Sequence, residues 1–246
     1  MTETICLHRI HEHNSDVPPV FHDINMTIHI NDLLVRLSDL DAENRLNNTT
    51  TLVTFDDGWR DVLLIPEDFF SKHETLNPVI FLTDAQIIGD LTPMPLHRLY
   101  KWMQENDFDL DELSQLPINR EDLKNLRITE QHRLVSHVTG KIQPTCEYLK
   151  PTEVAKLRAN GWIVGSHGPE HSDLRLLDDG ELTRLLSTTY SYIQSGDFKP
   201  WIAWPEGRWN NRIAKIARDI GFEQQFGIFE ESRRGTDTRV VLRKLW

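Results

Sequence analysis

The sequence is poor in the features that would mark a secreted, fibrous or membrane-bound protein. It has only two cysteines, Cys6 and Cys146, among 246 residues, too few for a disulfide framework or a cysteine-based zinc site. No apolar run approaches the roughly 18 residues of a membrane-spanning helix. No basic segment followed by an apolar stretch indicates a signal peptide, and there is no internal repeat or low-complexity tract. We therefore expect reduced thiols and a cytoplasmic protein.

Positive charge is also scarce. Lysine and arginine number 27 against 38 acidic residues, which gives a net charge of −11. An acidic surface repels phosphate backbones and anionic lipids, so we expect no nucleic-acid partner. The lack of a long apolar run leads us to expect no membrane span. The hydrophobic share of 39% and charged share of 26% are typical of a folded globular chain. At roughly 150 residues per domain, the length allows one or two domains.

Short apolar runs alternate with helix-patterned stretches. This alternation indicates βαβ units and a parallel sheet. In a parallel barrel, residues at the carboxyl ends of the strands converge on one face, so distant motifs can meet there. We predict strands at 4–10, 50–55, 78–83, 162–164, 201–204 and 240–242, and helices at 27–40 (capped by Asn31 or Asp32), 61–72, 151–160, 176–193 and 212–220.

Residues 90–150 do not follow this rhythm. They combine an acidic run with several prolines, and we interpret them as a mostly helical insertion between two strands of a single domain at 1–246. A lid, an oligomer contact and a connection without a function of its own all remain open for this segment. The oligomeric state is open as well.

Two adjacent carboxylates end one predicted strand, in the segment Thr54–Gly58. Neighbouring carboxylates are unfavourable unless a cation or a proton offsets their repulsion. Because successive side chains diverge along a strand, Asp57 can bind a metal while Asp56 faces a substrate. A solvated, aspartate-rich turn is the alternative.

His167 and His171 follow another predicted strand. Gly168 and Pro169 between them rule out a regular helix, so the pair lies on a shaped loop. Two neutral imidazoles and one aspartate form a three-ligand site with an open position, as in catalytic zinc centres. Two surface histidines would be the alternative.

The segment Trp204–Trp209 contains a Pro-Glu-Gly turn. Pro205 and Glu206 lie in a turn that can present a backbone N–H to an oxyanion. Trp204 or Trp209 can stack on a sugar ring, although either can equally be a core aromatic.

Taken in order, Thr54–Gly58, Gly165–His171 and Pro205–Gly207 resemble the three motifs of the polysaccharide deacetylase family, carbohydrate esterase family 4. The stretch at 149–174 is similar to the family's approach to its second motif. The resemblance implies a distorted (β/α) barrel of about seven parallel strands, a divalent metal, and removal of an N- or O-acetyl group from a carbohydrate.

Carried over to this sequence, the resemblance implies that Asp57, His167 and His171 bind the metal. Asp56 would be the base that activates a water on the metal for attack on the acetyl carbonyl. The backbone near Glu206 would hold the oxyanion. Zinc is the metal we expect, although cobalt, nickel and iron are compatible with these ligands.

Two features depart from the family pattern. No histidine follows His171, although many members place their catalytic acid near the carboxyl terminus. The segment around His8 resembles the N-terminal strand that supplies this acid in a permuted branch, similar to poly-N-acetylglucosamine deacetylases, so His8 is the candidate acid. Ala203 stands where the family often has a base-orienting arginine, and Arg243 is its candidate substitute.

We therefore expect a metal-dependent carbohydrate deacetylase. Its substrate would be an intermediate of surface-polysaccharide biosynthesis, such as a nucleotide- or lipid-linked sugar. A C–N hydrolase acting on a non-sugar amide and a catalytically inactive carbohydrate-binding member are the alternatives.

Overall fold

The computed structural model describes residues 3–107, 120–140, 147–229 and 234–246. Cys146 and the parts of the expected insertion at 108–119 and 141–146 lie outside these ranges. No helix in the described ranges is long and apolar enough to cross a membrane. The expected compartment stays a prediction.

Seven strands in the described residues form a closed barrel in which every neighbouring pair is parallel. The predicted (β/α) barrel is therefore confirmed. The sequence pattern missed the sixth strand, because its two glutamines and one glycine interrupt the apolar run. In barrel order the strands are β1 (Glu3–Leu7), β4 (Thr51–Phe55), β5 (Leu76–Leu82), β6 (Ile163–Ser166), β7 (Trp201–Ala203), β8 (Gln224–Ile228) and β9 (Val240–Leu245).

The predicted first strand is in fact two strands. After β1 the chain leaves the barrel at His8, and β2 (Arg9–His11) pairs with β3 (Thr27–His29) in a separate two-stranded sheet. His8 therefore lies at the carboxyl end of a barrel strand, next to the end of β4.

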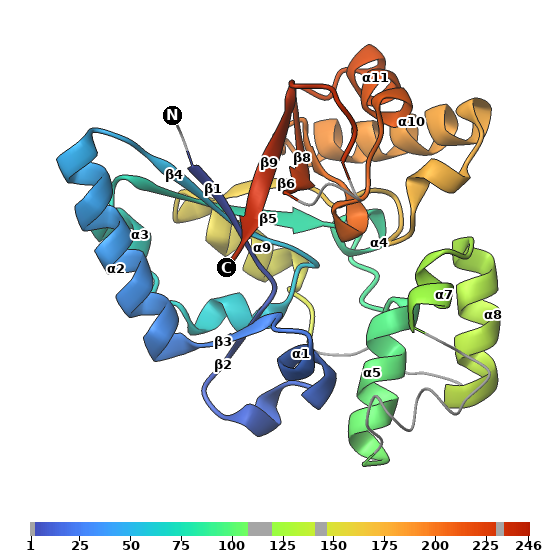
Figure 1. Ribbon diagram of the computed structural model, residues 1–246, viewed down its shortest axis with the longest axis horizontal. Coiled ribbons are helices and arrows are strands. Elements are labelled where there is room, and N and C mark those ends of the chain that lie inside the picture. Colours follow the sequence, from blue (N-terminus) through green and yellow to red (C-terminus); the bar gives the residue numbers. More distant parts are fainter. Residues whose placement is uncertain (1–2, 108–119, 141–146, 230–233) are drawn as a thin grey trace.

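Helices cover the outside of the barrel (Figure 1). Two of them differ from prediction. The helix expected at 27–40 begins at Ile30, where the His29 side chain accepts a hydrogen bond from the Asn31 N–H. The helix expected at 61–72 is split around Pro66 into a 3-10 helix and a short α-helix. The helices on this part of the chain are α1 (Pro19–Asp23), α2 (Ile30–Asn47), the 3-10 helices Asn14–Asp16 and Arg60–Leu64, and α3 (Phe69–Lys72).

The later helices agree more closely with the predicted ranges. Asparagine and aspartate caps that accept backbone hydrogen bonds start two of them, at Asp178 and Asn210. These helices are α9 (Pro151–Ala159), α10 (Asp179–Ser195) and α11 (Asn211–Ile220), with 3-10 helices at Leu174–Leu176 and Pro205–Gly207.

A group of helices lies between β5 and β6 in the chain. It comprises α4 (Asp84–Ile87), α5 (Pro95–Glu105), α7 (Arg120–Lys124) and α8 (Ile128–Thr139). Figure 1 shows α5, α7 and α8 gathered at one side of the barrel, near α1. Phe21 of α1, Leu99 of α5 and Val135 of α8 are buried in one shared apolar cluster. This packing holds the helices against the carboxyl end of the barrel, where the predicted site residues lie.

Candidate active site

The predicted motifs meet at the carboxyl ends of the barrel strands. His8 follows β1, the two aspartates follow β4, His167 and His171 follow β6, and Glu206 follows β7. A pocket of about 190 Å³ opens here, and residues of α1, α5 and α7 also line it. The predicted residues that line it are His8, Asp56, Asp57, His171 and Glu206.

Asp56 is held by a buried arginine from β9, the last strand of the barrel, which flanks β1 on the side away from β4. Arg243 of β9 donates to Asp56 Oδ1 at 2.6 Å and to Oδ2 at 2.8 Å, and both residues are buried. The arginine also donates to Thr54 Oγ1 at 3.1 Å. A two-pronged pair of this kind fixes both the position and the orientation of the carboxylate.

This pairing decides the charge of Asp56. Burial alone would raise the pKa of the carboxyl, but the guanidinium of Arg243 outweighs it and lowers the pKa to about 2. Asp56 is therefore ionised at neutral pH. The same attraction raises the pKa of Arg243 above its usual value, against the effect of burial.

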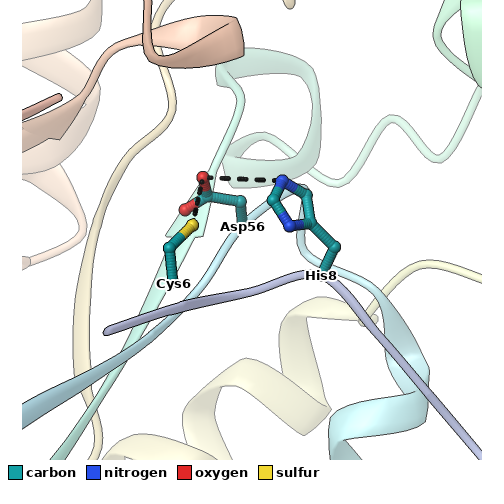
Figure 2. Close-up of side chains that lie close together, drawn as sticks. All are labelled: Cys6, His8 and Asp56. Carbon is teal, nitrogen blue, oxygen red and sulfur yellow. Dashed lines mark hydrogen bonds and ion pairs between the residues drawn. The ribbon is translucent and has the colours of Figure 1, made fainter. Parts of the chain in front are cut away.

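His8 and Cys6 face the same oxygen of Asp56 (Figure 2). The Cys6 thiol donates to Oδ2 at 3.4 Å, and His8 Nε2 lies 4.0 Å from it. Burial raises the pKa of Cys6 well above its ordinary value and lowers the pKa of His8. The thiol is therefore protonated, and the imidazole of the free protein is mostly neutral at pH 7.

Asp57 points away from Asp56 and towards the two loop histidines. Its Oδ1 lies 3.3 Å from His167 Nε2 and 3.2 Å from His171 Nε2. The backbone of Asp57 is left-handed, with φ 68°, and this turn separates the two neighbouring carboxylates. Burial lowers the pKa of His171 to about 4, which favours the neutral imidazole.

The donor set formed by Asp57, His167 and His171 fits a divalent metal. The three ligand atoms lie within 4.8 Å of one another. Asp57 Oδ1 is buried and makes no hydrogen bond, so its charge faces the two imidazoles. His167 Nδ1 is 2.9 Å from the Ala203 carbonyl oxygen, an acceptor that places the proton on Nδ1 and leaves the Nε2 lone pair for a metal.

Cys6, His8 and Asp56 form a second group of suitable spacing. This group is a poorer metal site for two reasons. Arg243 already compensates the charge of Asp56. The ligand form of cysteine is the thiolate, whereas the raised pKa of Cys6 keeps it a thiol.

Glu206 does not point into solvent. The ammonium of Lys124, on α7, donates to its carboxylate, and the side chains are 3% and 15% exposed respectively. Burial raises the pKa of Glu206, but Lys124 outweighs that effect and lowers it to about 2. The Glu206 backbone is left-handed, with φ 55°. This ion pair ties the helical group to the Pro-Glu-Gly turn.

The sugar-stacking interpretation of the two tryptophans is wrong. Trp204 is 0% exposed and Trp209 2% exposed, and both pack in the apolar cluster between the barrel and α11. Neither lines the pocket, and nor does Pro205. The two tryptophans are core aromatics, which was the alternative interpretation of the segment.

Two residues of the site carry no sequence motif. Lys124 and His97 both come from the segment at 90–150, and both line the pocket. Only Pro95, which starts α5, gives a local signal, since proline is common in the first turn of a helix. Their proximity to the motifs depends on the packing of the helical group against α1.

Comparison with known proteins supports the resemblance found in the sequence. Residues 123–225 match the family model described as polysaccharide deacetylase, and this confirms the resemblance to that family. The matched segment contains His167, His171 and Glu206 but not the aspartates of β4. The barrel is what brings these aspartates to the histidines. None of the curated proteins compared with the chain matches it.

Solved deacetylase structures share the fold over nearly the full chain. A deacetylase of Streptococcus pyogenes, PplD, solved with acetate, is 13% identical with a TM-score of 0.63, covering 100% of this chain and 92% of its own. IcaB from Ammonifex degensii is 14% identical, with a TM-score of 0.57, and the match covers 100% of this chain and 91% of IcaB. A de-N-acetylase from Aggregatibacter actinomycetemcomitans is 13% identical, with a TM-score of 0.56, and the match covers 99% of this chain and 94% of the de-N-acetylase.

The Lys124–Glu206 pair generates a stability prediction. Lys124→Met keeps the length of the side chain but removes the ammonium that compensates the buried carboxylate. Losing one partner of a buried pair costs roughly 3–5 kcal/mol, so the variant should unfold at clearly lower urea concentration.

Lys72→Met is the matched control, because Lys72 and its partner Asp68 are 67% and 61% exposed. This variant should unfold like the wild type. Equal midpoints for the two variants would show that the buried pair contributes nothing to the attachment of α7.

Proposed function

We propose that this chain, which carries a polysaccharide deacetylase match over residues 123–225, is a metal-dependent hydrolase that removes an acetyl group from a carbohydrate. The observation that carries the proposal is that two neighbouring aspartates have different partners. Asp57 faces two imidazoles, and Asp56 is held by Arg243 beside a third, His8.

In the proposed reaction, Asp57, His167 and His171 hold a divalent metal, with zinc as the first choice. When bound, the metal lowers the pKa of water and polarises the acetyl carbonyl. Its contribution matters here because a carboxylate with a pKa of about 2 is a weak base towards ordinary water.

Asp56 is the proposed base. Its Oδ2 is 3.9 Å from His167 Nε2 and 4.0 Å from His8 Nε2, so it lies between the proposed metal ligands and the proposed acid. Arg243 acts as a positioning residue, since its two hydrogen bonds hold the carboxylate in one orientation. We propose that Arg243 does the work of the base-orienting arginine that the family often has at the position of Ala203.

His8 is the proposed acid. It lines the pocket and protonates the leaving amine, or the leaving alcohol of an ester. Since His8 is mostly neutral in the free protein, it would receive its proton during the reaction from Asp56, once that carboxylate has taken a proton from the attacking water. The backbone at Glu206 borders the same pocket and is the proposed oxyanion site.

The shape of the pocket favours a small substrate. Its volume of about 190 Å³ is below the roughly 300–1,000 Å³ of sites that enclose drug-sized ligands. Phe21, Leu96 and Tyr100 line it, and we propose that it takes up the acetyl group. The proposed substrate is an intermediate of polysaccharide synthesis, such as a nucleotide- or lipid-linked sugar.

An inactive carbohydrate-binding role is the less supported alternative. Its main argument was that Ala203 stands where the family often has a base-orienting arginine. That argument is weakened because Arg243, on another strand, pairs with Asp56. Hydrolysis of a non-sugar amide uses the same residues, and a substrate panel distinguishes it from the main proposal.

The proposed function predicts acetate release by the zinc- or cobalt-loaded protein. We expect turnover of small soluble N- or O-acetylated sugars and none of insoluble chitin. Asp56→Asn should lower turnover by about 10²–10⁴-fold. Release from non-sugar N-acetyl amides alone would support the amide hydrolase, and no release from any substrate by metal-loaded protein would support the binding role.

The acid role predicts a distinct effect of His8→Ala. Turnover should fall by about 10²–10⁴-fold with metal content unchanged, because His8 is not one of the proposed ligands. His22→Ala, at a half-buried histidine that does not line the pocket, is the control. Loss of metal from the His8 variant, or unchanged turnover, would rule out the acid role.

A further inference from the structure

His97 lies beside the proposed metal ligands, although it belongs to the helical segment outside the barrel. It sits in the first turn of α5 and is 7% exposed. Its ring packs on Trp59, with the ring centroids 4.3 Å apart, and lies 5.8 Å from the ring of His171. Its Nε2 is 3.5 Å from Asp57 Oδ2.

Tyr148 and Asp57 face the two ring nitrogens of His97. The phenol oxygen accepts a hydrogen bond from the Met94 N–H at 3.3 Å and lies 2.7 Å from His97 Nδ1. The tyrosine keeps its hydroxyl proton, because burial raises its pKa well above the ordinary value. Because the ionised Asp57 carboxylate that faces Nε2 can only accept a hydrogen bond, we assign the imidazole proton to Nε2 and the hydroxyl as the donor to Nδ1.

The two oxygens of Asp57 consequently have different surroundings. Oδ2 faces His97 Nε2 and accepts from Trp59 Nε1 at 3.3 Å. Oδ1 faces His167 and His171 and makes no hydrogen bond. Donors on one carboxylate oxygen fix the orientation of the other towards a metal, as partners of metal ligands commonly do.

We propose that His97, oriented by Tyr148, is a positioning residue that directs Asp57 Oδ1 towards the metal. The inference rests on the proposed metal-dependent function and extends it to a residue outside the three motifs. It gives the segment at 90–150 a role in the site itself.

The backbone around Tyr148 supports this connection. Trp59 and Tyr148 form an antiparallel bridge. The Leu149 N–H donates to the Gly58 carbonyl at 2.9 Å, and the Arg60 N–H donates to the Glu147 carbonyl at 2.7 Å. The segment that carries Tyr148 is thus joined to the turn that carries Asp57, so the tyrosine, the histidine and the aspartate are held in register.

The test is zinc affinity, measured by competition with a chromophoric chelator at fixed pH. His97→Ala should weaken binding by about 10–100-fold, the usual effect of losing a partner of a metal ligand. His97→Gln should restore most of the affinity, because its amide nitrogen can replace Nε2 as a donor. Tyr148→Phe should weaken binding by less than His97→Ala.

His137→Ala, at an exposed histidine of α8, is the control and should bind zinc like the wild type. Far-UV circular dichroism establishes that each variant is folded. Wild-type affinity in the folded His97→Ala and Tyr148→Phe proteins would overturn the inference. Complete loss of zinc in both His97 variants would also overturn it, because His97 would then be a ligand.

The outcomes also separate this inference from the proposed function. A wild type that binds no zinc would overturn both. A wild type that binds zinc, together with a His97→Ala variant that binds equally tightly, would overturn only the role of His97.

Discussion

The buried pair between Arg243 and Asp56 is the interaction on which the rest of the site depends. It joins the last barrel strand to the second strand in barrel order, through the interior of the barrel. Two adjacent aspartates would repel each other in a buried site. The arginine compensates one of them, and the other is left facing the two histidines. The pair thus allows the proposed base and a proposed metal ligand to be neighbours in sequence.

The left-handed backbone at Asp57 is the second constraint. With φ 68°, it turns the second carboxylate away from the first, towards the loop after β6. Gly58 follows with φ 63°, and a Cβ there would lie 2.7 Å from atoms of Leu82 and Gln86. The glycine after the two aspartates is therefore required by both its conformation and its close packing. This explains physically why the motif ends in glycine.

The sequence pattern predicted a parallel sheet and most of the strand ends, because apolar runs followed by polar motifs are local signals, and the family resemblance implied the barrel. The sequence pattern predicted Asp56, Asp57, His167 and His171 for the same reason. It did not predict β8, whose glutamines hide the strand, or the break at His8. His97 and Lys124 could not be predicted, since they reach the pocket only through packing between α1 and the helical group. The sequence also could not show that Trp204 and Trp209 are buried in the core, where they cannot stack on a sugar.

The central claim is that this pocket holds a catalytic metal, and metal content by mass spectrometry tests it most directly. The wild type, incubated with zinc or cobalt, should retain close to one equivalent after desalting. His171→Ala should retain little, because it removes one of the three ligands. A wild type that retains no metal, or a variant that retains as much as the wild type, would contradict the account.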